Sequence, residues 1–197
     1  MKGLLSLSSA IDKLSYWIGR SVMWLVLLMV LISAGNAIIR KLFNTSSNAY
    51  LEAQWYLFAA VFLLGASYTM LQQGHVKIDV FISRFSRPTQ VKIEIFGIVM
   101  FLFPLVYFVI VEIFPILVQA YKTGEMSENA GGLIRWPVYA LVPIGFFLLG
   151  LQGLSELIKR IGFLKGLCPD PGEVNEVNAE QALAEHIQQQ QELQGQK

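Results

Sequence analysis

The stretch Val22–Ile32 reads VMWLVLLMVLI and holds no charged side chain. It forms the middle of a longer apolar segment, residues 17–41, which ends at Arg40 and Lys41. A helix of about 20 apolar residues crosses the roughly 30 Å hydrocarbon layer of a membrane. Because the apolar run continues past the small residues at 33–37, we expect a spanning helix here and not a cleaved signal peptide.

Three more stretches of this kind follow, at residues 50–72, 93–120 and 136–158. In lipid each must satisfy its own backbone hydrogen bonds, and a helix does so. The whole composition agrees, since 54% of the 197 residues are hydrophobic and 15% are charged, against about 25% charged in soluble domains. The sequence therefore predicts an all-α polytopic membrane protein, with four transmembrane helices in a domain of residues 17–166.

Lysine and arginine are distributed unevenly over the segments that connect these helices. Ten of them lie in the N-terminal segment, between the second and third helices, and directly after the fourth, whereas four lie in the other two loops. Cytoplasmic segments of membrane proteins carry the excess of basic residues. We therefore expect both termini in the cytoplasm and the loops 1–2 and 3–4 on the outer side.

The two ends of the chain differ from the central domain. In residues 1–16 a leucine or isoleucine recurs every three or four positions, with serine, aspartate and lysine between them, which predicts an amphipathic helix. The pattern allows this helix to lie on the membrane surface and continue into the first span, or to pack on a partner. Residues 167–197 are acidic and rich in glutamine, and we expect a polar cytoplasmic tail there.

Few ionisable side chains fall inside the predicted spans. Glu112 is the clearest, in the outer half of the third span. Because a bare charge in hydrocarbon is costly, we expect it to pair with Arg40, Lys41 or Arg135, or to meet a polar group of a partner subunit. The alternative is a carboxylate that faces water from a tilted helix. Glu94, near the inner end of the same span, is expected to reach water by snorkelling.

The residue types that active sites need are scarce. One cysteine and two histidines oppose a disulfide framework and a multi-ligand metal or haem site. The sequence has no phosphate-binding glycine loop, no nucleophile elbow and no HExxH motif. Topology and anionic lipid explain the basic loop, so a nucleic-acid partner is not needed. We therefore expect no catalytic residue, no cofactor and no metal, and we do not expect an enzyme.

Four motifs occur in a specific order on these spans. They are SSNAYLEAQWYLFAAVFLLGASYTM at Ser46–Met70, GHVKIDV at Gly74–Val80, SENAGGLIRWP at Ser127–Pro137 and PIGFFLLGLQGLSELIKR at Pro143–Arg160. Together they resemble the small membrane subunit (DctQ-like) of tripartite ATP-independent periplasmic (TRAP) transporters, over residues 16–166. The resemblance does not extend into the acidic tail.

The resemblance implies a scaffold subunit in the bacterial inner membrane. Its partners would be a large polytopic subunit, which moves sodium and an organic acid, and a periplasmic substrate-binding protein, which delivers that acid; membrane lipids surround it. The residues that match the family's motifs are expected to have structural or interfacial roles, and they are Glu52, His75, Asp79, Asn129, Trp136 and Pro143. With Glu112 and Arg135 they make up the candidate site.

The residues alone leave other functions open. An independent four-helix channel or carrier is the main alternative, although a self-sufficient carrier usually shows broken helices, repeats and several polar groups at the membrane midplane. A membrane-anchored redox subunit is opposed by the histidine and cysteine counts. Small residues at Gly65, and at Gly145, Gly150 and Gly153, could contact a partner or pack the four helices on one another.

Overall fold

The computed structural model describes residues 2–43, 47–73 and 84–171. The elements in this part of the chain are α1 (Lys2–Phe43), α2 (Asn48–Leu71), α4 (Arg87–Gly97), the π-helix η1 (Ile98–Leu102), α5 (Phe103–Thr123) and α6 (Trp136–Leu164). Because α4, η1 and α5 follow one another without a break, four helices of the described chain are long and apolar enough to cross a membrane. The prediction of an all-α protein with four spanning helices is confirmed.

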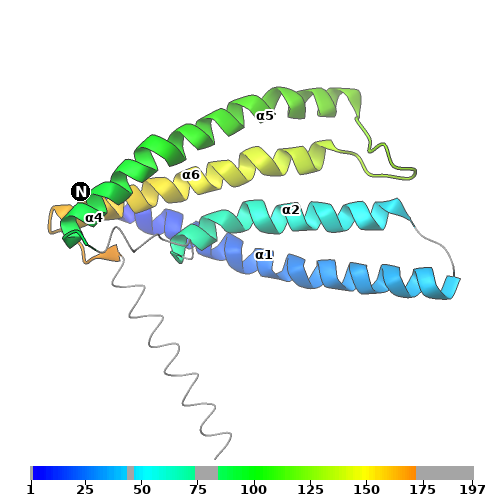
Figure 1. The fold of residues 1–197 in the computed structure, drawn as a ribbon, viewed down its shortest axis with the longest axis horizontal. Coiled ribbons are helices and arrows are strands. Elements are labelled where there is room, and N and C mark those ends of the chain that lie inside the picture. Colours follow the sequence, from blue (N-terminus) through cyan, green and yellow to red (C-terminus); the bar gives the residue numbers. More distant parts are fainter. Residues whose placement is uncertain (1, 44–46, 74–83, 172–197) are drawn as a thin grey trace, which may run out of the picture.

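The central helix of the bundle is α6, which contacts α1, α2, α4, η1 and α5. On one side α2 packs between α6 and α1, and on the other side α5 runs along α6 (Figure 1). The helices α1 and α5 therefore form the two edges of the bundle. We call the end at which α1 begins and α6 ends the terminal end, and the opposite end, with the α5–α6 loop, the loop end.

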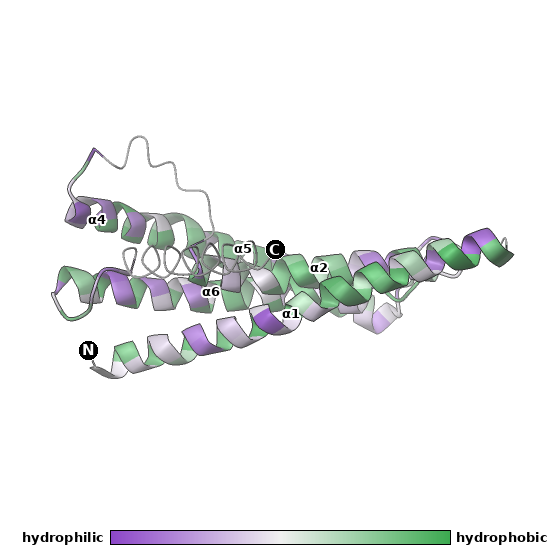
Figure 2. Cartoon of the chain, turned by 90° about the horizontal axis from the view of Figure 1, so that it is seen from below, coloured by the Kyte–Doolittle hydropathy of each residue, from purple (hydrophilic) through white to green (hydrophobic). Residues whose placement is uncertain are grey.

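The surface of the bundle is apolar along most of its length. Hydrophobic residues cover the middle of the helices, and hydrophilic residues gather toward both ends (Figure 2). Large side chains such as Trp24 and Phe62 are each 70% exposed. This distribution suits a protein whose solvent is lipid, where close packing holds helices together because lipid tails are as apolar as the side chains.

Glycines of α6 allow the helices to approach closely. A Cβ at Gly145 would lie 2.7 Å from the backbone oxygen of Leu63 in α2, and one at Gly153 would lie 2.5 Å from Leu102 Cδ2 in η1. At Gly65 of α2 no atom lies within 4 Å of such a Cβ. Of the two roles that the sequence left open, the α6 glycines pack the helices of this chain on one another.

No helix end falls near residue 16, because α1 is continuous through both of the segments that the sequence separated. Its first half turns Ser8 and Ser15 toward the bundle, at 1% and 2% exposed, whereas Leu4 and Leu7 remain about half exposed. Ser8 Oγ lies 2.7 Å from Ser155 Oγ of α6. Ile11, at 7% exposed, shares this contact face with the serines. The small serines permit close approach, and the Ser8 hydroxyl bonds across the interface.

The third span contains a π-helical turn immediately before a proline. The N–H group of Phe103 bonds to the carbonyl oxygen of Ile98, five residues earlier. Pro104 has no N–H group, so it cannot donate the hydrogen bond that a helical residue normally makes to the carbonyl oxygen four residues earlier. In a π turn the bond reaches five residues back, and such single turns occur inside α-helices. The continuous helix covers residues 87–123 and so extends beyond the predicted span of 93–120 at both ends.

Candidate functional site

The α5–α6 loop folds back on itself at the loop end. Gly124 ends α5 in the left-handed conformation, with φ of 60°. Met126 and Ile134 form an isolated antiparallel bridge, and the N–H group of Arg135 donates to the carbonyl oxygen of Glu125 at 2.9 Å. The loop is therefore a closed turn whose two arms are bonded to each other.

Glu52, in the second turn of α2, holds this loop in place. It is 4% exposed. Its Oε1 accepts hydrogen bonds from the Ser127 hydroxyl and, at 2.8 Å, from Asn129 Nδ2, and its Oε2 accepts one from the N–H group of Leu133 at 2.6 Å. A Cβ at Gly132 would lie 2.9 Å from Glu52 Oε1, so glycine fits this place. We call Glu52, Ser127, Asn129 and Leu133 the Glu52 cluster.

One face of α2 presents further groups to the loop. Asn48, Glu52 and Tyr56 are spaced by four residues and so lie above one another on that face. Asn48 Nδ2 donates to the carbonyl oxygen of Ala130, and the Tyr56 hydroxyl donates to that of Ile134, each at 3.0 Å. The beginning of α2 therefore acts as a platform on which the loop is fixed at three points.

Arg135 and Trp136 lie beside the Glu52 cluster. Arg135 Nη1 is 3.2 Å from Glu125 Oε1. A hydrogen bond with Tyr139, and after it the one with Glu125, raises the pKa of the Arg135 guanidinium. The Trp136 ring meets Tyr121 of α5 edge to face, with the ring centroids 5.5 Å apart. These contacts close the base of the loop between α5 and α6.

A second group of polar contacts lies at the terminal end and begins with Asp12 of α1. Asp12 Oδ1 accepts hydrogen bonds from Gln152 Nε2 at 2.9 Å and from Ser155 Oγ at 2.7 Å. Lys159 Nζ lies 3.2 Å from Asp12 Oδ2. Gln152 and Ser155 are fully buried, whereas the side chains of Asp12 and Lys159 are 26% and 22% exposed, so the polar bonds that hold α1 on α6 lie at the border of the interior.

The same group continues from α6 to α4. The carboxylate of Glu156, which is 1% exposed, forms ion pairs with Lys159 and Arg160. Arg160 Nε lies 2.7 Å from Glu94 Oε2 of α4. Glu94 is thus bound to a buried cation, while its own side chain keeps 18% of its surface exposed. The terminal network joins α1, α4 and α6 through Asp12, Glu94, Gln152, Ser155, Glu156, Lys159 and Arg160.

Glu112 takes no part in either group. It is exposed on α5, and among the described residues it forms no ion pair. Of the cations that the sequence offered, Arg135 is bonded to Glu125. Arg40 and Lys41 lie in the last turn of α1, which forms the other edge of the bundle (Figure 1). The side of α5 that carries Glu112 has no neighbouring helix from the described chain.

The structure places the remaining sequence-derived residues as follows. Glu52 and Asn129, which lie 77 positions apart, are in direct contact. Pro143 lies inside α6, two residues before the contact of Gly145 with α2. His75 and Asp79 lie outside the described residues.

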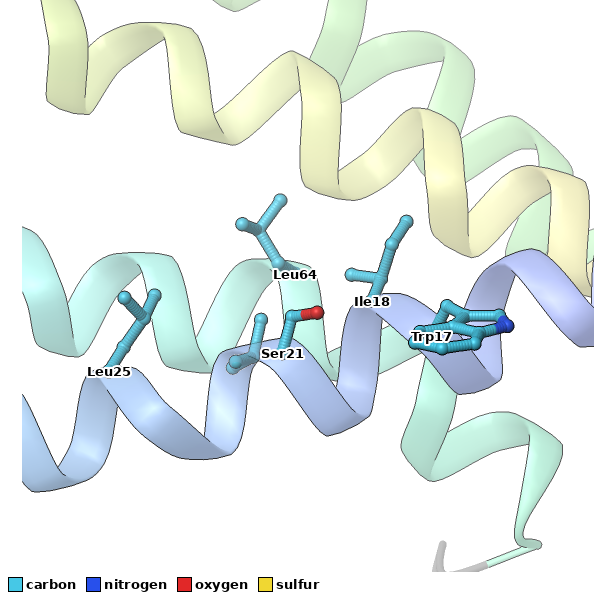
Figure 3. Close-up of a pocket in the computed structure, with 6 residues that line it drawn as sticks. Trp17, Ile18, Ser21, Leu25 and Leu64 are labelled. Carbon is cyan, nitrogen blue, oxygen red and sulfur yellow. The ribbon is translucent and has the colours of Figure 1, made fainter.

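A shallow apolar pocket lies between α1 and α2. Its volume is about 370 Å³, and Figure 3 shows the side chains that line it, which are Trp17, Ile18, Ser21, Val22, Leu25 and Leu64. Ser21 supplies its only hydroxyl group, and none of the lining residues is titratable. Within the described ranges, no group of three His, Cys, Asp or Glu side chains could hold a metal ion.

Sequence reasoning missed most members of the terminal network. A signal was available in Glu156, Lys159 and Arg160, because acidic and basic residues three and four positions apart lie on one helix face. The spacing of Asn48, Glu52 and Tyr56 was a similar signal for the platform on α2. Asp12 and Ser127 carried no signal, since their partners are distant in sequence.

We expect the substitution Glu52→Ala to release the α5–α6 loop. It removes two carboxylate oxygens that accept three hydrogen bonds, and it leaves the Leu133 N–H group without a partner. Exchange of the Leu133 amide with deuterium should become about ten times faster. The matched control is Glu128→Ala, an exposed carboxylate of the same loop. Unchanged exchange at Leu133 in the Glu52 variant would show that Glu52 does not hold the loop.

Four apolar helices of spanning length, tied together at both ends by buried polar side chains, define a polytopic helical membrane protein. Within that class the chain belongs to the DctQ family, because the family described as "Tripartite ATP-independent periplasmic transporters, DctQ component" matches residues 28–162. The match includes the Glu52 cluster and all of the terminal network except Asp12.

One similar protein is the C4-dicarboxylate TRAP transporter small permease protein DctQ of Pseudomonas aeruginosa. The two sequences are 30% identical over 121 residues, which cover 59% of this chain and 54% of that protein. The chain thus spans about half the length of this relative. No solved structure matches the chain.

Proposed function

We propose that this chain is the small permease subunit of a TRAP-type secondary transporter in the bacterial inner membrane. It braces a large transport subunit, which carries out sodium-coupled uptake of an organic acid that a periplasmic binding protein delivers. The observation that carries this proposal is the family match, which extends from the middle of α1 almost to the end of α6. The name of the similar protein, a C4-dicarboxylate TRAP transporter small permease, supports the proposal that the transported substrate is an organic acid.

The position of the buried charges supports a bracing role. Glu52 lies at the loop end, and Glu156, Arg160 and Asp170 lie at the terminal end. Each is bonded to other side chains of this chain, so these charges hold helices and loops together. A carrier that works alone usually has broken helices with polar groups at the membrane midplane. The buried charges that the structure describes are at the ends.

The distribution of lysine and arginine supports one orientation of the subunit. With the basic segments inside, the terminal end faces the cytoplasm. His75 and Asp79 then belong to a cytoplasmic loop in which they have structural roles. The Glu52 cluster, with Arg135 and Trp136 beside it, faces outward. On that side the binding protein docks on the complex of this chain and the large subunit.

Co-expression tests the assembly. The tagged full chain is produced together with a candidate large multi-span subunit from the same genome, and both are solubilised in a mild detergent. We expect the two proteins to co-elute in a fixed ratio, whereas an unrelated tagged four-helix membrane protein should elute alone. If this chain also elutes alone, the independent channel or carrier becomes the better account.

A further inference from the structure

An acidic residue stands on the uncovered side of α5. The side chain of Glu112 is exposed, and so are Leu105, Phe108 and Ile116, which lie on the same stripe at intervals of three and four residues. Their exposed fractions are 52%, 61% and 49%. A different side of α5 packs on α6, for example through Val106 against Gly150. We call Leu105, Phe108, Glu112 and Ile116 the Glu112 stripe.

The position of Glu112 along α5 places it deep within the span. The aromatic pair of Tyr121 and Trp136 marks the loop end, where such residues lie at the membrane interface. Glu112 precedes Tyr121 by nine residues, which corresponds to about 14 Å along a helix. That depth is about half of a 30 Å hydrocarbon layer. A glutamate side chain is too short to reach either interface from there.

Neither lipid tails nor the described part of this chain supplies a donor at that depth. Acyl chains have no hydrogen-bond donor, and phospholipid head groups lie at the interfaces. Arg135 is bonded to Glu125, and α1, with Arg40 and Lys41, forms the other edge of the bundle (Figure 1). A membrane-embedded carboxylate is costly unless another protein group bonds to it.

We propose that the Glu112 stripe is the surface on which the large transport subunit docks. The occupant is a transmembrane helix of that subunit, which places an arginine, a lysine or another hydrogen-bond donor opposite Glu112. The leucine, phenylalanine and isoleucine of the stripe pack on either side of this polar contact. A second copy of this chain is a poorer occupant, because two copies of the stripe would bring two carboxylates together. The inference rests on the proposed function.

Co-elution of the two subunits measures the contact. The full chain is co-expressed with the large subunit as wild type and as Glu112→Gln, Glu112→Leu and Glu112→Lys. We expect the Glu112→Gln variant to associate about three times more weakly than the wild type, and the Glu112→Leu variant about ten times more weakly, since a single interhelical polar contact is lost. Lys should abolish association, because it places a cation opposite the donor. The matched control Glu128→Leu removes an exposed loop carboxylate and should have no effect.

Cross-linking locates the surface independently of affinity. In a Cys168→Ser background, the variants Phe108→Cys and Ile116→Cys are combined with cysteines placed along the spans of the large subunit. We expect disulfide cross-links between the two subunits from both positions. Each variant is first shown to elute as a single folded species, so that a loss of association is not a loss of fold.

The outcomes separate this inference from the function on which it rests. If the wild-type subunits do not co-elute, the proposed function fails and the inference fails with it. If they co-elute, but the Glu112 variants associate normally and residues 108 and 116 form no cross-links to the large subunit, the inference alone is overturned. Cross-links between two copies of this chain would overturn it in favour of a dimer contact.

Discussion

Replacing Gly145 with valine is expected to force α2 away from α6 and to unfold the bundle at a lower temperature than the wild type. A Cβ at this position would lie 2.7 Å from the Leu63 carbonyl oxygen and 2.9 Å from its carbonyl carbon. Both are backbone atoms of a helix and cannot rotate away. Overpacking costs about 1–3 kcal/mol where side chains can adjust, and we expect about 3 kcal/mol or more here.

The measurement is thermal unfolding in detergent, followed by circular dichroism. Gly65→Val is the matched control, since it places the same side chain on α2 where no atom lies within 4 Å. The control should melt within a few degrees of the wild type. Equal melting temperatures for Gly145→Val and Gly65→Val would mean that α2 and α6 do not pack as closely as described.

The substitution Arg160→Ala should produce the second large effect. It removes the cation that Glu94 of α4 and Glu156 of α6 share, and Glu156 is 1% exposed. Breaking a buried ion pair by removing one partner typically costs about 3–5 kcal/mol, because a charge is left uncompensated. Lys159 still pairs with Glu156, so we expect the lower part of this range.

A second substitution tests the cause of that loss. If unpaired charge is responsible, adding Glu156→Gln to the Arg160→Ala variant should restore part of the lost stability. Lys165→Ala, an exposed cation just beyond the end of α6, is the control and should be nearly neutral. A single Arg160→Ala variant as stable as the control would contradict the terminal network.

The spans of this protein could be predicted because lipid imposes a simple rule. A long apolar segment must be a helix there, so the hydropathy pattern alone indicates all four spans. The start of α6 at Trp136 was predicted to the residue, and Pro137 in its first turn favours that start. The pattern of residues 1–16 allowed an amphipathic helix that continues into the first span, as α1 does. Its contact with α6 could not be predicted, because that contact depends on which helices are neighbours.

The partners of the polar residues could not be predicted, because they depend on which helices are neighbours. Glu52 was expected to have a structural or interfacial role because it lies in a motif. Its hydrogen-bond partner Asn129 could not be predicted, since it lies 77 positions later in the sequence. Arg135 was offered as a partner for Glu112 and is bonded to Glu125 in the same loop. Local spacing predicts contacts within one helix, whereas contacts between helices follow from packing that glycines such as Gly145 permit.

Uptake by reconstituted protein tests the central claim most directly, namely that this chain braces a transporter and does not transport by itself. Proteoliposomes are prepared with this chain alone, and with this chain, the large subunit and the binding protein together, and uptake of a panel of labelled organic acids is measured under an inward sodium gradient. The account predicts sodium-dependent accumulation by the complete set and none by this chain alone. Accumulation driven by the gradient in liposomes that hold only this chain would contradict it.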